Sequence, residues 1–484
     1  MRGRVESIRS PRFRREHRIN FPSTPATGMA ELWEAPIDTG EVPDSGSEFD
    51  VIVVGGGPGG SAAAGYAAID GCKVLLLEKA IWPRDKACGD AVGGKSLEHV
   101  TELGVRDMIE ATPHTRVTGI TFSSADGTVI SIPLPEDDFE KKEAGYTLPR
   151  IQFDYMMFKR AAELVREAGG SVIQGFEVTE VVVEGGDEPD EKLVSGIRGK
   201  VGGRRSASEV LGFTAPLTIG AGGYNCPVAR EITEGVYGEP MRDPEELHYC
   251  AAYREYWKNV GGCEGYRQNI EIHFTESILP GYFWIFPSGD YVNVGIGMVI
   301  HEMKKRKVNL KKMQADLIAN HPQFKHRFAD ATLVEKSGKG WQLPFGSPRK
   351  KPPSFQPRRV SMGGALCIGD AAALVDPFSG EGIGNALVSA KMAVEHFDRE
   401  LHQDGFSLSS ARAYQVELWK RLGPELINSH RMQYMVRRKR LMNLFMRKAK
   451  RKPEMQDALV DMLASKEAQE RIHSPWFWIK SVLF

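Results

Sequence analysis

Three glycines near the start of the chain have the spacing of a phosphate-binding loop. Gly55, Gly57 and Gly60 fit the pattern G-x-G-x-x-G, between an apolar β-branched run at 51–54 and a run of small residues. The first glycine allows a tight turn, the second lets the backbone approach a pyrophosphate, and the third lets a helix lie close to a strand. The helix N-terminus favours the phosphates, and Glu78, 18 residues after Gly60, is expected to accept the ribose hydroxyls. This pattern predicts dinucleotide binding.

A second glycine-rich segment, far along the chain, indicates which dinucleotide is bound. An apolar run at 365–368 ends in Gly369 and Asp370, and a carboxylate there can accept hydrogen bonds from the ribityl hydroxyls of a flavin. The glycine turn at 380–384 opens a helix whose first N–H groups can face the pyrimidine end of the flavin, where negative charge collects on reduction. A plain NAD-dependent dehydrogenase needs no such second site. The predicted cofactor is therefore FAD.

The same motifs carry a resemblance to a known family. Together with KACGD at 86–90, RIQFD at 150–154 and the aromatic run YFWIFP at 282–287, they resemble the geranylgeranyl reductase family of flavoproteins. That family belongs to the wider group with the p-hydroxybenzoate hydroxylase fold. The resemblance covers residues 50–400. One departure is that the family's proline three residues before the tyrosine stands one residue closer here, as Pro280.

The resemblance implies both a fold and a reaction. The implied fold is α/β, with a Rossmann-type FAD-binding domain, an inserted mainly β substrate domain and a C-terminal helical region. The implied reaction is reduction of carbon–carbon double bonds of a geranylgeranyl or other isoprenoid chain by hydride transfer from reduced flavin, with a proton from Tyr282 or water. The flavin's own reductant is expected to be NAD(P)H or another electron donor.

The resemblance also implies roles for particular residues. Cys88 is expected close to the flavin, and Tyr282, Trp284 and Phe286 are expected to line the cavity, where an aromatic wall contacts an apolar chain and excludes water. From the residues alone, two alternatives stay open. The aromatic run also fits a core strand with alternate side chains inward, and Cys88 also fits a small buried residue in a glycine-rich turn.

The expected site residues form three overlapping sets. The catalytic set is Cys88, Tyr282 and Trp284. The substrate-binding set is Tyr282, Trp284, Phe286 and Pro287. The cofactor-binding set, in which Arg150 assists the phosphates, is Gly55, Gly57, Pro58, Gly59, Gly60, Glu78, Lys79, Cys88, Gly89, Arg150, Gly369, Asp370, Pro377, Gly380, Gly382 and Ile383.

Two other functions remain open. The first is an FAD-dependent monooxygenase or halogenase acting on a small or specialised metabolite, which shares the fold and both FAD motifs. Flavin halogenases carry W-x-W-x-I-P, whereas Tyr282 and Phe286 occupy two of those positions here, which favours the reductase. The second is a membrane-associated flavoprotein without turnover of its own, such as a maturation factor.

The composition excludes several classes of protein. The 484 residues include 63 Lys+Arg and 63 Asp+Glu, and this balance argues against a dedicated nucleic-acid binder. No apolar run reaches the roughly 18 residues of a transmembrane helix. The six cysteines form no C-x-x-C pair, so neither a disulfide scaffold nor a metal site is expected. We expect a cytoplasmic enzyme whose partner is an isoprenoid or other apolar small molecule, with no nucleic acid and no metal.

The hydrophobic patterns predict the elements that position the site. They predict a helix over 150–168, a strand over 171–173, strands within 176–220 and 245–300, and a helix over 308–330. The predicted division is a disordered leader at 1–48, a discontinuous FAD-binding domain at 49–115, 145–225 and 345–400, a substrate-binding domain at 116–144 and 226–344, and a helical, basic region at 401–484.

The basic C-terminal region has two open interpretations. Residues 431–452 contain ten Lys and Arg and no acid, interleaved with methionine, leucine and phenylalanine. Such a helix can lie on an anionic membrane surface or present cations to a lipid diphosphate, which would make the protein peripheral to the membrane. It can equally be a helix docked on the protein body. The last ten residues, 475–484, are apolar enough to need a partner.

Overall fold

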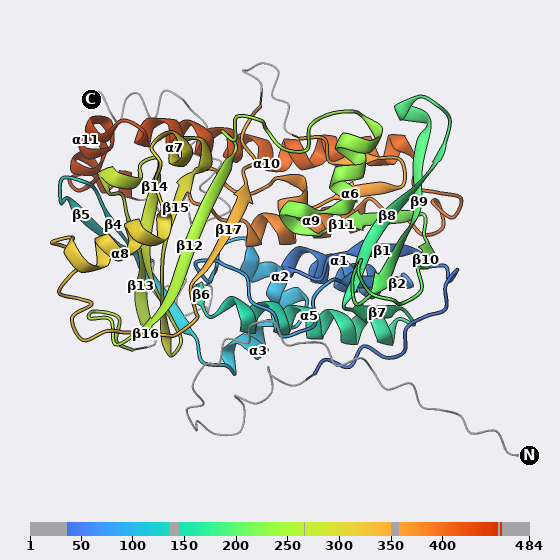
Figure 1. Ribbon diagram of the computed structural model, residues 1–484, viewed down its shortest axis with the longest axis horizontal. Coiled ribbons are helices and arrows are strands. Elements are labelled where there is room, and N and C mark those ends of the chain that lie inside the picture. Colours follow the sequence, from blue (N-terminus) through green and yellow to red (C-terminus); the bar gives the residue numbers. More distant parts are fainter. Residues whose placement is uncertain (1–35, 135–144, 266, 350–357, 454, 457–484) are drawn as a thin grey trace, which may run out of the picture.

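The computed structural model describes residues 36–134, 145–265, 267–349, 358–453 and 455–456. Within them the chain forms a six-stranded sheet, a ten-stranded sheet and a small three-stranded sheet, with helices around them (Figure 1). The ten-stranded sheet occupies one half of the molecule and the six-stranded sheet the other, and α10 (Leu408–Val436) runs along both. The expected α/β fold with C-terminal helices is confirmed.

The six-stranded sheet is the predicted Rossmann-type unit. All neighbouring strands in it are parallel except the outermost pair. The two strands around the first glycine turn are buried along their whole length, as parallel strands covered on both faces must be. Its strands, in spatial order, are β18 (Ser361–Met362), β19 (Ala365–Cys367), β11 (Leu217–Gly220), β1 (Val51–Val54), β2 (Val74–Glu78) and β7 (Ser171–Gln174).

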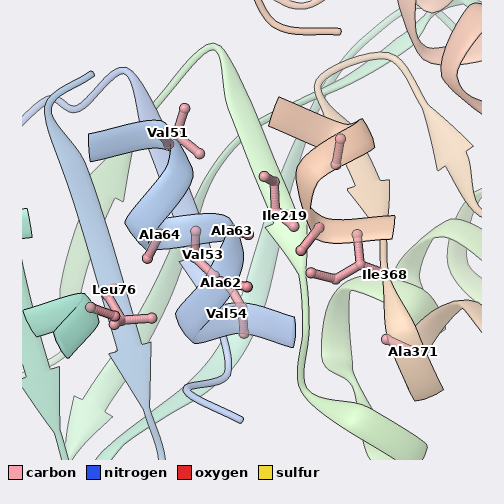
Figure 2. Packing of buried hydrophobic residues seen from close by; sticks show 14 of the residues in the cluster. Val51, Val53, Val54, Ala62, Ala63, Ala64, Leu76, Ile219, Ile368 and Ala371 are labelled. Carbon is pink, nitrogen blue, oxygen red and sulfur yellow. The ribbon is translucent and has the colours of Figure 1, made fainter. Parts of the chain in front are cut away.

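Three helices pack side by side next to this sheet. They are α1 (Pro58–Ile69), α5 (Arg150–Glu167) and α9 (Ile383–Glu395). Because α1 has alanine at its sheet-facing positions, it can approach β1 closely, and Figure 2 shows Ala62 and Ala63 among the valines of β1. The small sheet contacts β2 and β11 and consists of β8 (Phe176–Gly185), β9 (Lys192–Val201) and β10 (Leu211–Thr214).

The ten-stranded sheet is antiparallel apart from one parallel pair, β4 with β13. Its strands are β3 (Ala91–Val92), β4 (Thr115–Ser123), β5 (Val129–Pro133), β6 (Tyr146–Thr147), β12 (Tyr249–Lys258), β13 (Arg267–His273), β14 (Gly281–Ser288), β15 (Tyr291–Val299), β16 (Thr332–Leu333) and β17 (Lys339–Pro344). Shorter helices are α2 (Ser96–Glu102), α3 (Arg106–Glu110), α6 (Pro227–Arg230) and α7 (Ile300–Lys305).

The aromatic strand β14 serves two faces of this sheet. Side chains alternate along a strand, so Phe283 and Ile285 face a core under α8 (Leu310–Asn320). Trp284 and Phe286 face the opposite side, in a second cluster. The helix predicted over 308–330 ends at Asn320, because the residue before a proline disfavours helical backbone and Pro322 follows His321.

The C-terminal helices cover that second cluster. Helix α10 and the following α11 (Lys439–Ala449) bury Met432, Met442, Phe445 and Met446 in the cluster that contains Trp284. The apolar side of the basic region is therefore covered by the protein itself, as in the docked interpretation. Residues 475–484 lie outside the described residues. None of the described helices combines the length and the apolar composition needed to cross a bilayer.

Strand pairing differs from the predicted division at the domain crossings. Strands β3 and β6 pair in the ten-stranded sheet, although the division assigns their residues to the FAD-binding domain. Residues 36–48, assigned to the leader, lie against the body: Ile37 is buried, and the Gly46 N–H donates to the Gly212 carbonyl at 2.8 Å. Residues 1–35 lie outside the described residues, and the rest of the division stays a prediction.

Candidate active site

A cavity of about 870 Å³ is lined by residues of both large sheets. This volume is near the upper end of the range for small-molecule sites, roughly 300–1,000 Å³. Both glycine segments line the cavity, as do Cys88 and the three aromatic residues of β14. Of the predicted site residues, only Gly60 and Pro287 are not part of the lining. The structure thus brings together segments that are more than 300 residues apart.

The two exceptions have positions that explain them. A Cβ added to Gly60 would lie 1.7 Å from the Gly55 carbonyl oxygen, so Gly60 permits close packing inside the turn. Pro287 is buried in β14, where it pairs with Val292 of β15, and its carbonyl accepts a hydrogen bond from Thr147. Pro287 therefore belongs to the sheet, and its position does not support the predicted contact with substrate.

The first glycine turn fits the phosphates and ribose of FAD. Helix α1 has no side-chain cap at its N-terminus, so its first N–H groups remain available at the cavity. A Cβ added to Gly57 would meet only the tip of Arg84, at 3.3 Å, which leaves the space beside this backbone open. Glu78 accepts hydrogen bonds from the Gly56 and Ala80 N–H groups, at 2.9 and 2.8 Å, and these bonds hold its carboxylate at the cavity.

The second glycine turn lines the same cavity as the first. Asp370 accepts a hydrogen bond from the Lys86 ammonium at 2.9 Å, so Lys86 is a cavity residue that was not predicted. Asp376 stabilises the turn by accepting from the N–H groups of residues 378 and 379, at 2.9 and 2.7 Å. Glu381 accepts from the Gly384 N–H at 2.5 Å and satisfies one of the N–H groups at the start of α9. Gly380, Gly382 and Ile383 of this turn line the cavity.

Residues 84–90 form a strap between the two sheets. Asp85 accepts two hydrogen bonds from Arg254 of β12, at 2.6 and 2.7 Å, and both side chains are buried. At the other end of the strap, Asp90 is completely buried and accepts from the Tyr256 hydroxyl at 2.7 Å. The ten-stranded sheet therefore fixes both ends of the strap, and Cys88 lies between them at the cavity.

Cys88 itself is held through its backbone and its thiol. Its carbonyl accepts a hydrogen bond from the Asn293 amide at 2.7 Å. Its thiol interacts with the buried guanidinium of Arg150, which also binds Asp154 through two hydrogen bonds of 2.7 and 2.9 Å. Burial disfavours the charge of Arg150, but Asp154 and Cys88 outweigh it and raise the pKa of Arg150 well above its usual range. Arg150 thus stays charged and faces Asp154 and Cys88.

The aromatic wall is continuous along β14. The ring centroids of Tyr282 and Trp284 are 5.9 Å apart, and those of Trp284 and Phe286 are 6.4 Å apart. The Tyr282 hydroxyl donates to the Ser379 carbonyl and so ties the wall to the second glycine turn. Desolvation raises the pKa of Tyr282, which keeps the phenol neutral. The aromatic run is therefore both a cavity wall and a core strand. Tyr282, Trp284 and Phe286 line the cavity, whereas Phe283 and Ile285 pack in the core.

Three further features of the site were not predicted. Asn293 donates to the Cys88 strap and accepts from Trp284. Gly295 lies under the Trp284 ring, and G-x-G at 295–297 inside a strand is a sequence signal for such a close approach. Gln433 of α10 lines the cavity and donates to the Pro377 carbonyl at 2.6 Å. No local pattern could place Gln433 there, because the contact depends on how α10 docks.

The buried carboxyl of Asp90 predicts a pH dependence of stability. Burial raises its pKa to about 6, although Arg254 and hydrogen bonds lower it. Protonation is therefore easier in the folded protein, and Asp90 contributes stability below about pH 4 that is lost as pH rises through about 6. We expect the free energy of unfolding of the wild type to rise by about 1 kcal/mol relative to Asp90→Asn between pH 7 and pH 5.

Urea unfolding followed by circular dichroism at both pH values measures this difference. Asn suits position 90 because it tolerates the left-handed backbone found there, with φ of 67°. Equal pH dependence in the two proteins would contradict the raised pKa. Among the residues that the structure describes, no group of three or more His, Cys, Asp or Glu side chains lies together so that it could hold a metal ion.

Two family models match the chain, one after the other. The model described as FAD binding domain matches residues 48–243. The model described as geranylgeranyl reductase catalytic domain matches residues 249–338, which include the aromatic strand β14 and four other strands of the ten-stranded sheet. The first match supports FAD as the cofactor whose fit the first glycine turn shows.

The chain is also similar to individual proteins over most of its length. Digeranylgeranylglycerophospholipid reductase 1 of Methanopyrus kandleri is 30% identical over 371 residues, which are 76% of this chain and 85% of that protein. Menaquinone reductase of Mycolicibacterium smegmatis is 28% identical over 354 residues, 72% of this chain and 75% of that protein. A solved geranylgeranyl bacteriochlorophyll reductase-like protein of Thermoplasma acidophilum shares the fold, with a TM-score of 0.65 at 22% identity, over 88% of this chain and 98% of that chain.

Proposed function

Since the chain belongs to the geranylgeranyl reductase family of FAD-dependent oxidoreductases, we propose that it reduces carbon–carbon double bonds of a geranylgeranyl-type isoprenoid chain. One observation carries this proposal. The two glycine turns that fit FAD and the apolar aromatic wall of β14 line the same cavity. A long apolar substrate can therefore contact the wall while its double bond lies beside the cofactor.

We propose that residues around the six-stranded sheet bind the cofactor and that residues of the ten-stranded sheet bind the substrate. Around the six-stranded sheet, the backbone at 57–59 holds the phosphates, Glu78 the ribose, Asp370 the ribityl hydroxyls and the turn at 380–383 the flavin ring. When bound, FAD supplies the redox chemistry, which is hydride transfer to one carbon of the double bond. Lys86 orients the Asp370 carboxylate through its hydrogen bond of 2.9 Å. Arg150, expected at the phosphates, faces Cys88 and Asp154, so we assign it to holding the strap.

The ten-stranded sheet supplies the substrate wall. Tyr282, Trp284 and Phe286 give apolar contact to the chain and shield the reduced cofactor from bulk water. The second carbon of that bond also needs a proton. Tyr282 is a weak acid here, because desolvation raises its pKa and its hydroxyl already donates to Ser379. We therefore propose that a water molecule supplies the proton and that Tyr282 positions the second glycine turn.

The substrate class follows from the cavity and the relatives. Relatives are named for a prenylated glycerophospholipid and for menaquinone, whose common part is a prenyl chain. We propose a membrane lipid or quinone with such a chain as substrate, and a nicotinamide dinucleotide or another electron carrier as reductant. Anaerobic titration of the holoprotein with NADH and NADPH, followed by flavin absorbance, tests the reductant.

Such a substrate resides in a bilayer, and the outer face of α11 is basic. Its apolar side is covered by the protein, whereas Arg440 and Arg447 are exposed, as is Arg438 just before the helix, and Arg447 also pairs with Asp126. We propose a peripheral, electrostatic contact with an anionic membrane surface on the cytoplasmic side. Sedimentation with anionic vesicles should then decrease as salt is raised. Binding that is unaffected by salt would contradict an electrostatic contact.

Product mass tests the proposed reaction. Holoprotein is incubated anaerobically with a chemical reductant and a geranylgeranyl lipid, and the lipid is analysed by mass spectrometry. The reductase proposal expects two added hydrogens for each double bond reduced, and a fully saturated lipid is the unreactive control. An added oxygen or halogen under aerobic conditions would support the monooxygenase or halogenase instead. An unchanged lipid in every condition would favour a flavoprotein without turnover.

A further inference from the structure

One buried side chain, Asn293 of β15, connects the aromatic wall to the strap that carries Cys88. Asn293 is completely buried. Its Nδ2 donates to the Cys88 carbonyl at 2.7 Å, and its Oδ1 accepts from the Trp284 Nε1–H at 2.8 Å. Both partners line the cavity, whereas Asn293 lies behind them. The amide thus joins the cofactor side of the site to its substrate side.

An amide suits this place because Cys88 and Trp284 offer it hydrogen-bonding groups of opposite kinds. The Cys88 carbonyl can only accept, and the indole N–H of Trp284 can only donate. The short amide of Asn offers two donors on Nδ2 and an acceptor on Oδ1, so it satisfies both partners at once, and its Nδ2 also interacts with the buried carboxyl of Asp90. A buried partner left without its hydrogen bond would be destabilised, which favours movement of the strap or the ring.

The indole ring has little freedom apart from this bond. A Cβ added to Gly295 would lie 2.0 Å from Cζ2 of Trp284, so the ring rests on the bare backbone of β15. A Cβ added to Gly89 would lie 2.9 Å from the Phe286 ring and 3.7 Å from the Trp284 Nε1, so the strap lies directly over the wall. The strap, Asn293 and Trp284 therefore pack as one unit.

We propose that Asn293 is a positioning residue that sets the separation between the Cys88 strap and the aromatic wall, and hence where the prenyl chain meets the cofactor. The inference rests on the proposed function only for the identity of the chain. The two hydrogen bonds of Asn293, to Cys88 and to Trp284, belong to the protein itself, and their effect can be measured without any prenyl substrate. Two substitutions at position 293 and one at position 284 distinguish the hydrogen bond to Cys88 from the hydrogen bond to Trp284.

Asn293→Asp keeps an acceptor for Trp284 but loses the donor to the Cys88 carbonyl and adds a second carboxyl beside Asp90. Asn293→Leu loses both hydrogen bonds without adding a carboxyl. Trp284→Phe removes the hydrogen bond between the indole and Asn293 and leaves the bond between Asn293 and the strap in place. The first readout is the rate at which iodoacetamide alkylates Cys88 in the FAD-free protein, with the labelled peptide resolved by mass spectrometry from those of the other cysteines. We expect about a tenfold faster rate in both variants at position 293, and an unchanged rate in Trp284→Phe.

Gln314→Leu is the matched control. Gln314 is a buried amide on α8, on the other face of the same sheet, and donates to the Val294 carbonyl next to Asn293 in the chain. Its loss should lower the melting temperature about as much as Asn293→Leu, because each leaves buried groups unpaired. The rate of Cys88 alkylation in Gln314→Leu should stay at the wild-type value, since its bonds do not reach the strap.

The second readout uses the holoproteins. We expect kcat for prenyl reduction to fall at least about tenfold in both variants at position 293, with KM little changed because the apolar wall remains. We also expect altered visible circular dichroism of the bound flavin. Wild-type alkylation rates in Asn293→Asp and Asn293→Leu would overturn the inference. Faster alkylation in the variants would support the role of Asn293 even if none of the proteins, including the wild type, reduced a prenyl lipid. That second result would contradict only the proposed function.

Discussion

Gly57→Val is expected to give a folded protein that does not retain FAD. A side chain at this position would meet only the flexible end of Arg84 within the protein, at 3.3 Å, and the backbone φ of −71° is allowed for any residue. The valine methyl groups would instead occupy the space beside the first turn of α1, where the pyrophosphate must approach the backbone. We expect the affinity for FAD to fall at least about 100-fold.

Equilibrium dialysis with FAD measures this loss, and thermal unfolding of the FAD-free protein shows that the fold is intact. Gly60→Ala is the neighbouring control. Its new Cβ would lie 1.7 Å from the Gly55 carbonyl oxygen and outside the cavity, so this variant should unfold at a lower temperature even without FAD. Wild-type affinity for FAD in Gly57→Val would show that the cofactor does not approach this turn.

Gly295→Ala is expected to produce a yellow protein that hardly reduces prenyl chains. The added methyl would overlap the Trp284 ring, 2.0 Å from its Cζ2, and force the ring toward the cavity. Such overpacking should lower the free energy of unfolding by about 1–3 kcal/mol. Misplacement of the substrate wall should lower the prenyl reduction rate about 100-fold. FAD retention should persist, because both glycine turns are unchanged.

Gly297→Ala is the matched control on the same face of β15. Its Cβ would lie 3.4 Å from Cys250 Sγ and 3.8 Å from Trp284, which are ordinary contacts. We expect this variant to lose far less activity in a steady-state assay of prenyl reduction. Adding Trp284→Phe to Gly295→Ala removes the indole atoms that overlap the new methyl, so the double variant should be no worse than Gly295→Ala alone. Full activity in Gly295→Ala would show that the position of Trp284 is unimportant.

Local sequence patterns predicted the two glycine turns that the structure places at one cavity. The strand, glycine turn and small-residue helix at 51–69 form one contiguous unit, so residue types alone fix its conformation. The second turn was predicted for a chemical reason, which is the need of a flavin for donors at its pyrimidine end. The cavity brings the two turns together. The alternation in β14 likewise followed from the aromatic run at 282–287.

Contacts between distant segments could not be predicted from one sequence. Lys86 meets Asp370 across 284 positions, and neither residue shows a local pattern that selects the other. Gln433 reaches the cavity only because α10 docks on the ten-stranded sheet, which depends on packing of the whole apolar side. The basic composition of that region indicates a charged surface but not where its apolar side packs. The end of α8 was predictable, since Pro322 is a helix-stop signal.

The central claim is that one cavity holds FAD and a prenyl double bond together. Its most direct test is to reduce the holoprotein anaerobically, remove excess reductant and add a geranylgeranyl lipid while recording flavin absorbance in the blue region. We predict that the absorbance returns, with one flavin reoxidised for each double bond lost, and that a saturated lipid has no effect. A flavin that stays reduced with every prenyl compound, yet reoxidises when oxygen is admitted, would contradict the claim.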